Sequence, residues 1–185
     1  MSTFGDGLDA AVQKSFTRPV PRSAGAQMRY LVKRLKGTRA VADLLRISQR
    51  TVERYVKDQI KKPRPDLAAR LDHEVRKRWQ PQVRARARRR AATTDGIVID
   101  TRARIGYTAP VGSTDDARIR HLTVALPPQY AARLFDAQQA GASDRQLQEI
   151  AAEGLKEVYF QDAGRRAGSL EEVRFTDVEQ VAFEL

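Results

Sequence analysis

The sequence predicts an α+β protein in which a helical N-terminal domain is followed by a small α+β domain. Up to Trp79, apolar residues recur every three or four positions, which is typical of amphipathic helices. Further along, residues 97–99 and 119–126 are apolar or alternating runs bounded by turn residues, which indicates strands. We therefore expect two domains, residues 1–92 and residues 93–185.

Charge is distributed unevenly along the chain, whose formal net charge is +11. Residues 1–90 hold 24 Lys and Arg against 8 Asp and Glu, whereas residues 91–185 hold 10 against 15. A basic half of this density indicates a polyanionic partner, either a nucleic acid or an anionic membrane surface. No apolar run approaches the roughly 18 residues of a membrane span, and the N-terminus does not resemble a secretory signal. We expect a cytoplasmic protein with no membrane partner.

Four helices are expected in the first domain. The first begins near Ser23 and ends at Gly37, the second is capped by Thr38, and the third is capped by Ser48. The fourth follows Pro65. Their apolar faces are formed by Met28, Leu31, Val32 and Leu35, by Val41, Ala42, Leu44 and Leu45, by Val52, Tyr55 and Val56, and by Leu67, Leu71, Val75 and Trp79.

Residues 83–90 form a basic arm, expected to be helical on DNA and loose without it, and residues 91–95 are expected to be a linker. In the second domain, Pro127 ends the second strand. Two helices then follow, one with Tyr130, Leu134 and Phe135 on its apolar face and one opened by a capping box of Ser143 and Gln146. The tail, residues 173–183, is expected to be extended.

Residues 38–57 match the helix-turn-helix pattern. Ala42 stands where the two helices cross, a position that needs a small residue because the backbones approach closely there. The apolar positions of the pattern are occupied by Val41, Leu45, Ile47, Val52 and Tyr55. The sequence departs at Arg46, where many such proteins have a glycine that allows a left-handed residue. An ordinary helical hairpin shares this spacing.

The polar side of the last of these helices favours DNA binding over a helical hairpin. Gln49, Arg50 and Arg54 carry donors suited to purine edges in the major groove. The helix would leave the groove at Lys57, Lys61, Lys62 and Arg64, which are better suited to phosphate contacts. The DNA-binding candidates in this segment are Gln49, Arg50, Thr51, Arg54, Lys57, Lys61, Lys62 and Arg64.

The arginines of the basic arm form a second, less specific group: Arg84, Arg86, Arg88, Arg89 and Arg90. Such a run suits phosphate or minor-groove contacts, and it also resembles a nuclear-import cluster. We favour phosphate contacts.

Sequence patterns of the common catalytic sites are absent. The chain has no cysteine, no phosphate-cradling glycine loop and no His-Glu-x-x-His helix. His73 and His121 are interpreted as surface or packing residues, and Asp115 with Asp116 as acidic residues that open a turn or helix. We expect no enzyme activity and no cofactor bound by this chain itself.

Several segments across essentially the whole chain resemble the streptomycete telomere terminal proteins. They are residues 23–33, residues 48–65, the stretch from Ile97 through Tyr107-Thr-Ala-Pro, Leu122-Thr-Val-Ala-Leu-Pro-Pro, Glu157-Val-Tyr-Phe-Gln-Asp and Val173-Arg-Phe-Thr-Asp. Members of that family are bound covalently to the 5′ ends of linear chromosomes and plasmids. They prime the synthesis that fills the recessed 5′ end, because a side-chain hydroxyl accepts the first deoxynucleotide.

The resemblance implies an attachment residue and a set of partners. The family's attachment threonine follows the Tyr-Thr-Ala-Pro segment, which here points to Thr114, with Ser113 and Tyr107 as rivals. The implied partners are telomeric DNA, a telomere-associated protein that recruits the terminal protein, and a DNA polymerase. Mg²⁺ on that polymerase would activate the hydroxyl. The protein would then act at chromosome ends in the nucleoid.

Two other hypotheses stay open on the sequence. The chain fits a noncovalent helix-turn-helix regulator whose acidic second half dimerises or binds an effector. The order strand, Pro127-Pro128 and two helices also fits a ribbon-helix-helix-like dimer module. The oligomeric state is open, and a homo-oligomer is compatible with each hypothesis.

Overall fold

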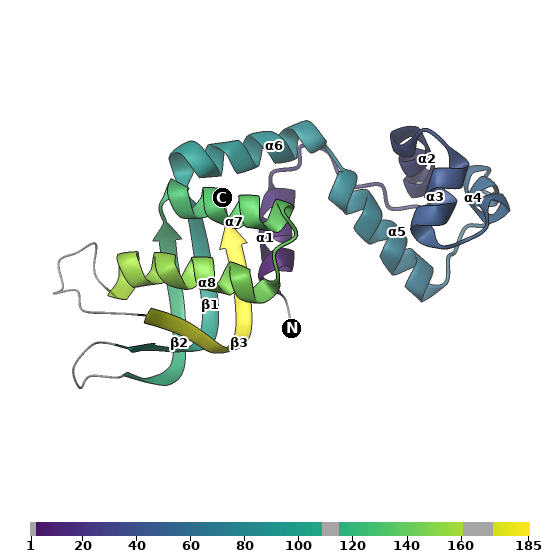
Figure 1. The fold of residues 1–185 in the computed structure, drawn as a ribbon. Helices are drawn as coiled ribbons and strands as arrows, with labels where there is room; N and C mark the ends of the chain where they lie inside the picture. Colours follow the sequence, from purple (N-terminus) through teal and green to yellow (C-terminus); the bar gives the residue numbers. More distant parts are fainter. Residues whose placement is uncertain (1–2, 109–114, 161–171) are drawn as a thin grey trace. The chain divides into compact units, whose positions relative to one another are not determined.

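The computed structural model describes residues 3–108, 115–160 and 172–185, and the chain folds into two compact units (Figure 1). Residues 17–81 form a helical unit, and residues 1–16 together with 82–185 form a unit of helices around an antiparallel sheet. The α+β fold class expected from the sequence is therefore confirmed.

Four helices build the helical unit: α2 (Ala24–Leu35), α3 (Thr38–Leu45), α4 (Gln49–Val56) and α5 (Pro65–Arg78). All of them coincide with the expected helices. Their apolar faces meet in one core, in which Met28, Leu31, Leu45, Val52 and Leu71 are fully buried. Because this core includes residues from every helix, it fixes α3 and α4 against α2 and α5.

Two expectations about the helix ends are wrong. Gly37, not Thr38, is the N-cap of α3, and Gly37 does not supply the left-handed residue that ends α2. That residue is Lys36, at φ 60°, while Gly37 is extended at φ 168°. Ser23 and Ser48 cap α2 and α4 as expected, since their hydroxyls accept hydrogen bonds from the Ala26 and Thr51 amides.

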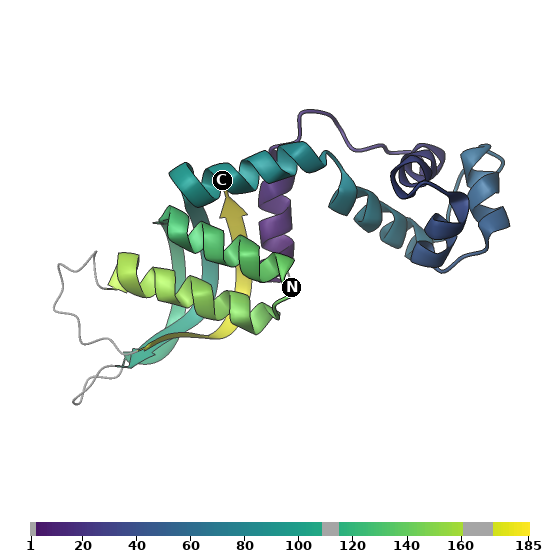
Figure 2. The same cartoon turned by 45° about the horizontal axis from the view of Figure 1, so that its top comes forward.

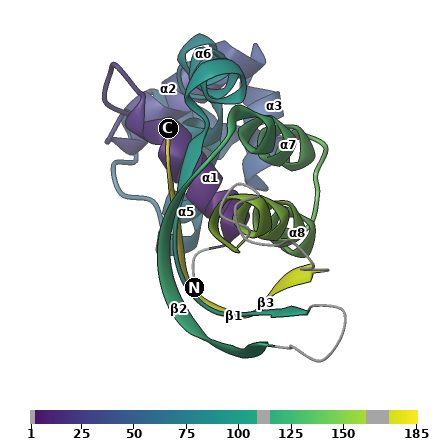
Figure 3. The same ribbon diagram turned by 90° about the vertical axis from the view of Figure 1, so that its left-hand side faces the viewer.

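The mixed unit places its helices on one face of a three-stranded antiparallel sheet. The strands are β1 (Ile97–Thr108), β2 (Asp115–Leu126) and β3 (Glu172–Glu184), in the order β2-β1-β3. Figure 3 shows the sheet curving around the helices α1 (Phe4–Lys14), α7 (Pro128–Gln139) and α8 (Asp144–Leu155). In Figure 2, α7 and α8 run side by side across it.

Strand β1 alternates between the helix-covered face and the outer face. Ile97, Ile99, Ala103 and Ile105 are buried toward the helices, whereas Arg102 and the residues that alternate with the buried set are more exposed. Both β1 and β2 are longer than the runs 97–99 and 119–126 expected from the sequence. Beyond Ile99, the charged residues Asp100, Arg102 and Arg104 alternate with the buried residues of β1.

Helix α1 was not expected from the sequence, although it carries a capping box of Thr3 and Asp6. Phe4 and Leu8 are fully buried in the core of the mixed unit, and the Phe4 ring lies 5.7 Å from that of Phe183 on β3 in an edge-to-face contact. Residues at the chain's N-terminus therefore belong to the mixed unit.

The two units do not follow the expected boundary at residues 92 and 93. Helix α6 (Pro81–Arg90) runs directly into η1 (Ala91–Asp95), a π-helix that packs on α7, so the expected basic arm and linker are ordered helix. Gly96 then turns the chain into β1 at φ 75°, where a Cβ would lie 2.2 Å from the Leu126 carbonyl oxygen. The unit boundary consequently falls near Pro81.

None of the described helices is long and apolar enough to cross a membrane. The expected strand-helix-helix order is present as β2, α7 and α8, but β2 pairs with β1 of the same chain.

Candidate nucleic-acid interface

Helices α3 and α4 contact each other through small and apolar side chains and are joined by residues 46–48. Ala42 is 4% exposed, and Val41 on α3 and Val52 on α4 are fully buried. The turn depends on Arg46, which adopts the left-handed conformation at φ 54° and ψ 50°. Many helix-turn-helix proteins have a glycine at this position. Here an arginine adopts the left-handed conformation instead.

Helix α2 approaches the end of α4 closely at Gly25. A Cβ on Gly25 would lie 2.0 Å from Asp58 Oδ1 and 3.1 Å from the Tyr55 carbonyl oxygen. Arg29, one turn later on α2, donates to Asp58 at 2.7 Å and to the Val56 carbonyl at 2.9 Å. These contacts fix the end of α4 against α2, which orients the exposed face of α4.

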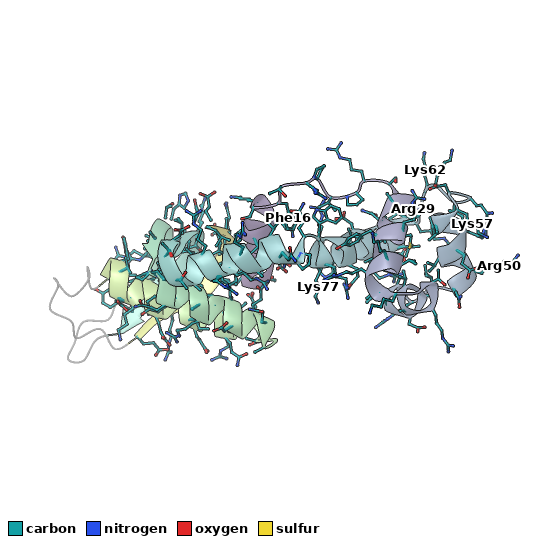
Figure 4. The ribbon with its side chains drawn as sticks, turned by 90° about the horizontal axis from the view of Figure 1, so that it is seen from above. Phe16, Arg29, Arg50, Lys57, Lys62 and Lys77 are labelled. Carbon is teal, nitrogen blue, oxygen red and sulfur yellow. The ribbon has the colours of Figure 1, made fainter. Side chains whose placement is uncertain are left out.

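The exposed face of α4 and the segment after it are cationic. Arg50 on α4 and Lys57 at its end are exposed (Figure 4), and Arg54 on α4 is also exposed. Lys61, Lys62 and Arg64 are exposed in the segment that leads to α5. Among the described residues, no carboxylate lies within ion-pairing distance of any of these six side chains, so their charges are not compensated by an ion pair there.

Two of the sequence candidates have local partners. Gln49 donates to Thr38 Oγ1 and to Glu53 Oε1, each at 3.0 Å, and Thr51 Oγ1 lies 2.8 Å from Ser48 Oγ. To contact a base, Gln49 would have to break these hydrogen bonds and form new ones with the base. The Thr51 hydroxyl contacts Ser48, the N-cap residue of α4. The Gln49 contact also brings the first turn of α3 beside that of α4.

Sequence reasoning missed further cations of the helical unit. Lys33, Arg34 and Lys36 near the end of α2, Arg39 on α3 and Arg46 directly after α3 are exposed and have no ion pair with the described residues. Arg39 follows Thr38, which contacts Gln49 of α4. The contact between the first turns of α3 and α4 is a tertiary one that the spacing of charges along the chain does not indicate.

The arginines of α6 separate into two groups. Two of them have internal partners and are not presented to a phosphate as expected. Arg84 is 7% exposed and donates to Asp9 at 2.8 Å, and Arg88 lies over the Phe135 ring and donates to Gln138 at 3.3 Å. Burial, with the neighbouring Arg84 charge, lowers the pKa of Arg88. Arg86 and Arg89 are exposed, and Arg90 pairs with Asp95 at 2.6 Å. Arg86 and Arg89 are therefore the arginines of α6 that are open to an added anion.

The proposed attachment residues are only partly within the structure. Thr114 and Ser113 lie outside the described residues. Tyr107 lies on β1, where it pairs in register with Asp115, and its ring contacts that of Phe160. His121 lies 3.1 Å from Asp100, and His73 is exposed on α5. Within the described ranges, no three His, Cys, Asp or Glu side chains gather as a metal site would require.

The mixed unit has a groove between α8 and the start of β3. Its lining includes Arg145, Glu149, Glu172 and Arg174. Arg145 pairs with Glu149 at 3.2 Å, and Arg174 pairs with Glu172. Since both cations already face carboxylates, this groove is less suited to a phosphate than the surface at α4.

Comparison of the chain with models of protein families, with curated proteins and with solved structures found no match.

Proposed function

We propose that the helical unit binds duplex DNA with α4 in the major groove, as a helix-turn-helix. The observation that carries this proposal is the set of six exposed cations on and after α4 for which the described part of the chain offers no carboxylate partner. Helix α5 of the same unit gives the contrast: Arg70, Arg76 and Arg78 each pair with an acidic residue one turn earlier. Unpaired like charges repel one another unless a polyanion neutralises them.

The side chains divide by their place on α4. Arg50 and Arg54 project from the helix itself and would read base edges, for which the bidentate guanidinium is suited. Lys61, Lys62 and Arg64 follow the helix and would bind phosphates. Arg39 at the start of α3 would add a phosphate contact beside α4.

We further propose that the chain is a DNA terminal protein. The resemblance to the streptomycete telomere terminal proteins supports this proposal. The Thr114 hydroxyl would attack the α-phosphate of a deoxynucleoside triphosphate, so that a phosphodiester forms and pyrophosphate leaves. A partner polymerase would supply the metal ions for this step, and a telomere-associated protein would bring the chain to the telomeric DNA.

A salt titration of the full chain on a duplex tests the DNA-binding proposal. If all six cations neutralise phosphates or lie beside them, log K should fall against log salt with a slope of about −5. Replacing Lys61 and Lys62 with alanine should reduce the slope by about 2. The matched control replaces Arg70 and Arg76 on α5, which changes the net charge equally, and it should leave the slope unchanged. Equal slopes for the two variants would exclude Lys61 and Lys62 as phosphate contacts and so contradict the proposed interface.

Electrophoresis of the host's genomic DNA tests the terminal-protein proposal independently. Terminal restriction fragments should enter the gel only after protease digestion, because the attached protein retards them. Equal mobility with and without protease would favour a noncovalent helix-turn-helix regulator.

A further inference from the structure

Three aromatic rings and an arginine from distant parts of the chain meet at the end of the sheet where β1 ends and β2 begins. The rings belong to Tyr107 on β1 and to Tyr159 and Phe160 on η2 (Lys156–Phe160), the π-helix that continues α8. Tyr107 and Phe160 have ring centroids 5.7 Å apart, and Tyr159 and Phe160 have centroids 5.0 Å apart. The Arg120 guanidinium lies over the Phe160 ring at 5.5 Å from its centroid. We call these four side chains the aromatic cluster.

The aromatic cluster is open to solvent on one side. Tyr159 is 41% exposed, and Tyr107 and Phe160 are half-buried at the margin of the core. The ring of Tyr159 makes its edge-to-face contact with Phe160, and its hydroxyl makes no hydrogen bond with the described residues. A tyrosine required only for the core would be buried, as Tyr130 is at 7% exposed.

The local charge also distinguishes this place. Tyr159 and Phe160 lie on a π-helix, as Ala91–Asp95 do elsewhere in the unit, and short π-helical segments occur often at functional sites. Arg118 and Arg120 are two residues apart on β2 and so lie on one face of the strand. Glu157, the carboxylate of η2, accepts a hydrogen bond from the Tyr130 hydroxyl at 2.5 Å. The Glu157 carboxylate therefore contacts Tyr130 and not the rings of the aromatic cluster.

We propose that the aromatic cluster is a stacking site for a base of single-stranded DNA. Aromatic rings bind unpaired bases face to face, and an arginine beside them adds cation–π and phosphate attraction. A base within a duplex is covered by its neighbours and cannot stack in this way, so the ligand is an unpaired strand. This surface belongs to a different unit from α4, and it is a second nucleic-acid site.

The sheet register gives the site its place in the proposed function. Tyr107 pairs across the sheet with Asp115, the residue that directly follows Thr114 in the sequence. The inference rests on the proposed function in taking DNA as the ligand. The cluster would hold a base of the unpaired strand at the chromosome end, and its Tyr107 pairs with the residue that follows the priming threonine in the sequence.

Fluorescence anisotropy tests the inference. The full chain is titrated against a labelled oligothymidylate of about 12 nucleotides, a length within the known range of single-strand sites. Saturating unlabelled duplex is added, so that α4 is occupied. Tyr159→Ala should weaken binding about tenfold, the order of effect expected for the loss of one stacked base. Tyr159→Phe keeps the ring and should bind within about twofold of the unmodified protein. The matched control is Ile119→Ala, which removes an apolar side chain 48% exposed on the same unit, and it should bind normally.

Photo-crosslinking gives a second readout. An oligonucleotide with 5-iodouracil should crosslink to Tyr159, Phe160 or Tyr107, and Phe160→Leu, which retains most of the volume but not the ring, should reduce the yield. Unchanged affinity for Tyr159→Ala, crosslinks confined to residues 17–81, or no binding of oligothymidylate would each overturn the inference. Duplex affinity should be the same for all these variants. If the unmodified protein does not bind duplex DNA, the proposed role of α4 is contradicted. The measurements of oligothymidylate binding at the aromatic cluster would still stand.

Discussion

Arg84 on α6 donates a hydrogen bond to Asp9 on α1 at 2.8 Å, and this ion pair joins segments 75 residues apart in sequence. Arg88, one turn further along α6, lies 3.6 Å from the same carboxylate, and its Nε is buried with no hydrogen-bond partner among the described residues. Asp9 is therefore the counter-charge that allows two arginines of a basic helix to lie against the mixed unit. Its loss would leave both guanidinium groups without that charge.

Asp9→Asn should destabilise the mixed unit by about 1.5–3 kcal/mol, the range for hydrogen bonds to charged groups. Chemical unfolding followed by far-ultraviolet circular dichroism measures the change. The control is Glu149→Gln, which removes a carboxylate from an exposed pair on α8, and we expect a loss of about 0–0.5 kcal/mol. Similar losses for the two variants would mean that the Asp9 pair is no stronger than a surface ion pair.

Arg46→Gly should stabilise the helical unit by about 0.5–1 kcal/mol, because glycine adopts the left-handed conformation without the steric cost that a Cβ brings. Trp79, the only tryptophan, lies in this unit and reports its unfolding by fluorescence. Arg54→Gly is the matched variant, since Arg54 is exposed inside α4, and there glycine should destabilise by about 1 kcal/mol. If Arg46→Gly also destabilises the unit, the Arg46 side chain makes a contact whose stabilisation exceeds the steric cost of its left-handed backbone.

Replacing the residues proposed to read bases and replacing those proposed to bind phosphates should have different effects on sequence specificity. Arg50→Ala or Arg54→Ala should cost about 1–3 kcal/mol on the preferred duplex and less on others, so that sequence preference relaxes. Replacing Lys61 and Lys62 should weaken all duplexes about equally. Affinities across a panel of sites measure this difference. Indistinguishable profiles would mean that α4 does not lie in a groove.

Thr114→Ala should abolish labelling of the protein by a radioactive deoxynucleotide in the presence of the polymerase and template, because the attacking hydroxyl is lost. Thr114→Ser should retain partial labelling, since the hydroxyl remains but the β-branch that restrains it is removed. Ser113→Ala should label normally, and all three variants should bind duplex DNA as before. Labelling of Thr114→Ala, with the nucleotide mapped to Ser113 or Tyr107, would move the attachment site.

Alkaline pH should destabilise the mixed unit partly through Tyr130. Burial, together with the hydrogen bond to Glu157, raises the pKa of Tyr130 from 10.0 to about 12. Above pH 10 the unfolded chain loses this proton while the folded chain keeps it, so the stabilisation present below pH 10 is lost as the pH rises toward 12. Tyr130→Phe should therefore lose less stability between pH 9 and pH 11 than the unmodified protein. Parallel curves from urea unfolding would contradict the raised pKa.

The sequence by itself determined the helices of the helical unit and the exposed cationic face proposed to bind DNA. Periodicity identifies the buried side of α4 from Val52 and Tyr55, so the exposure of Arg50 and Arg54 follows from helix geometry. The need for a left-handed residue at Arg46 also follows from the short turn between two helices. These are local properties, because residues a few positions apart are sufficient to specify them.

Only the tertiary structure decided which charges and rings come together over long distances. The arginines of α6 look alike in sequence, yet Asp9 attracts Arg84 and leaves Arg86 exposed. Tyr107 and Phe160 are also far apart in sequence. Their rings meet because the end of β1 and η2 lie at the same end of the sheet. A side chain's burial depends on a partner that the fold brings to it, and a charged residue is buried only where that partner compensates its lost hydration.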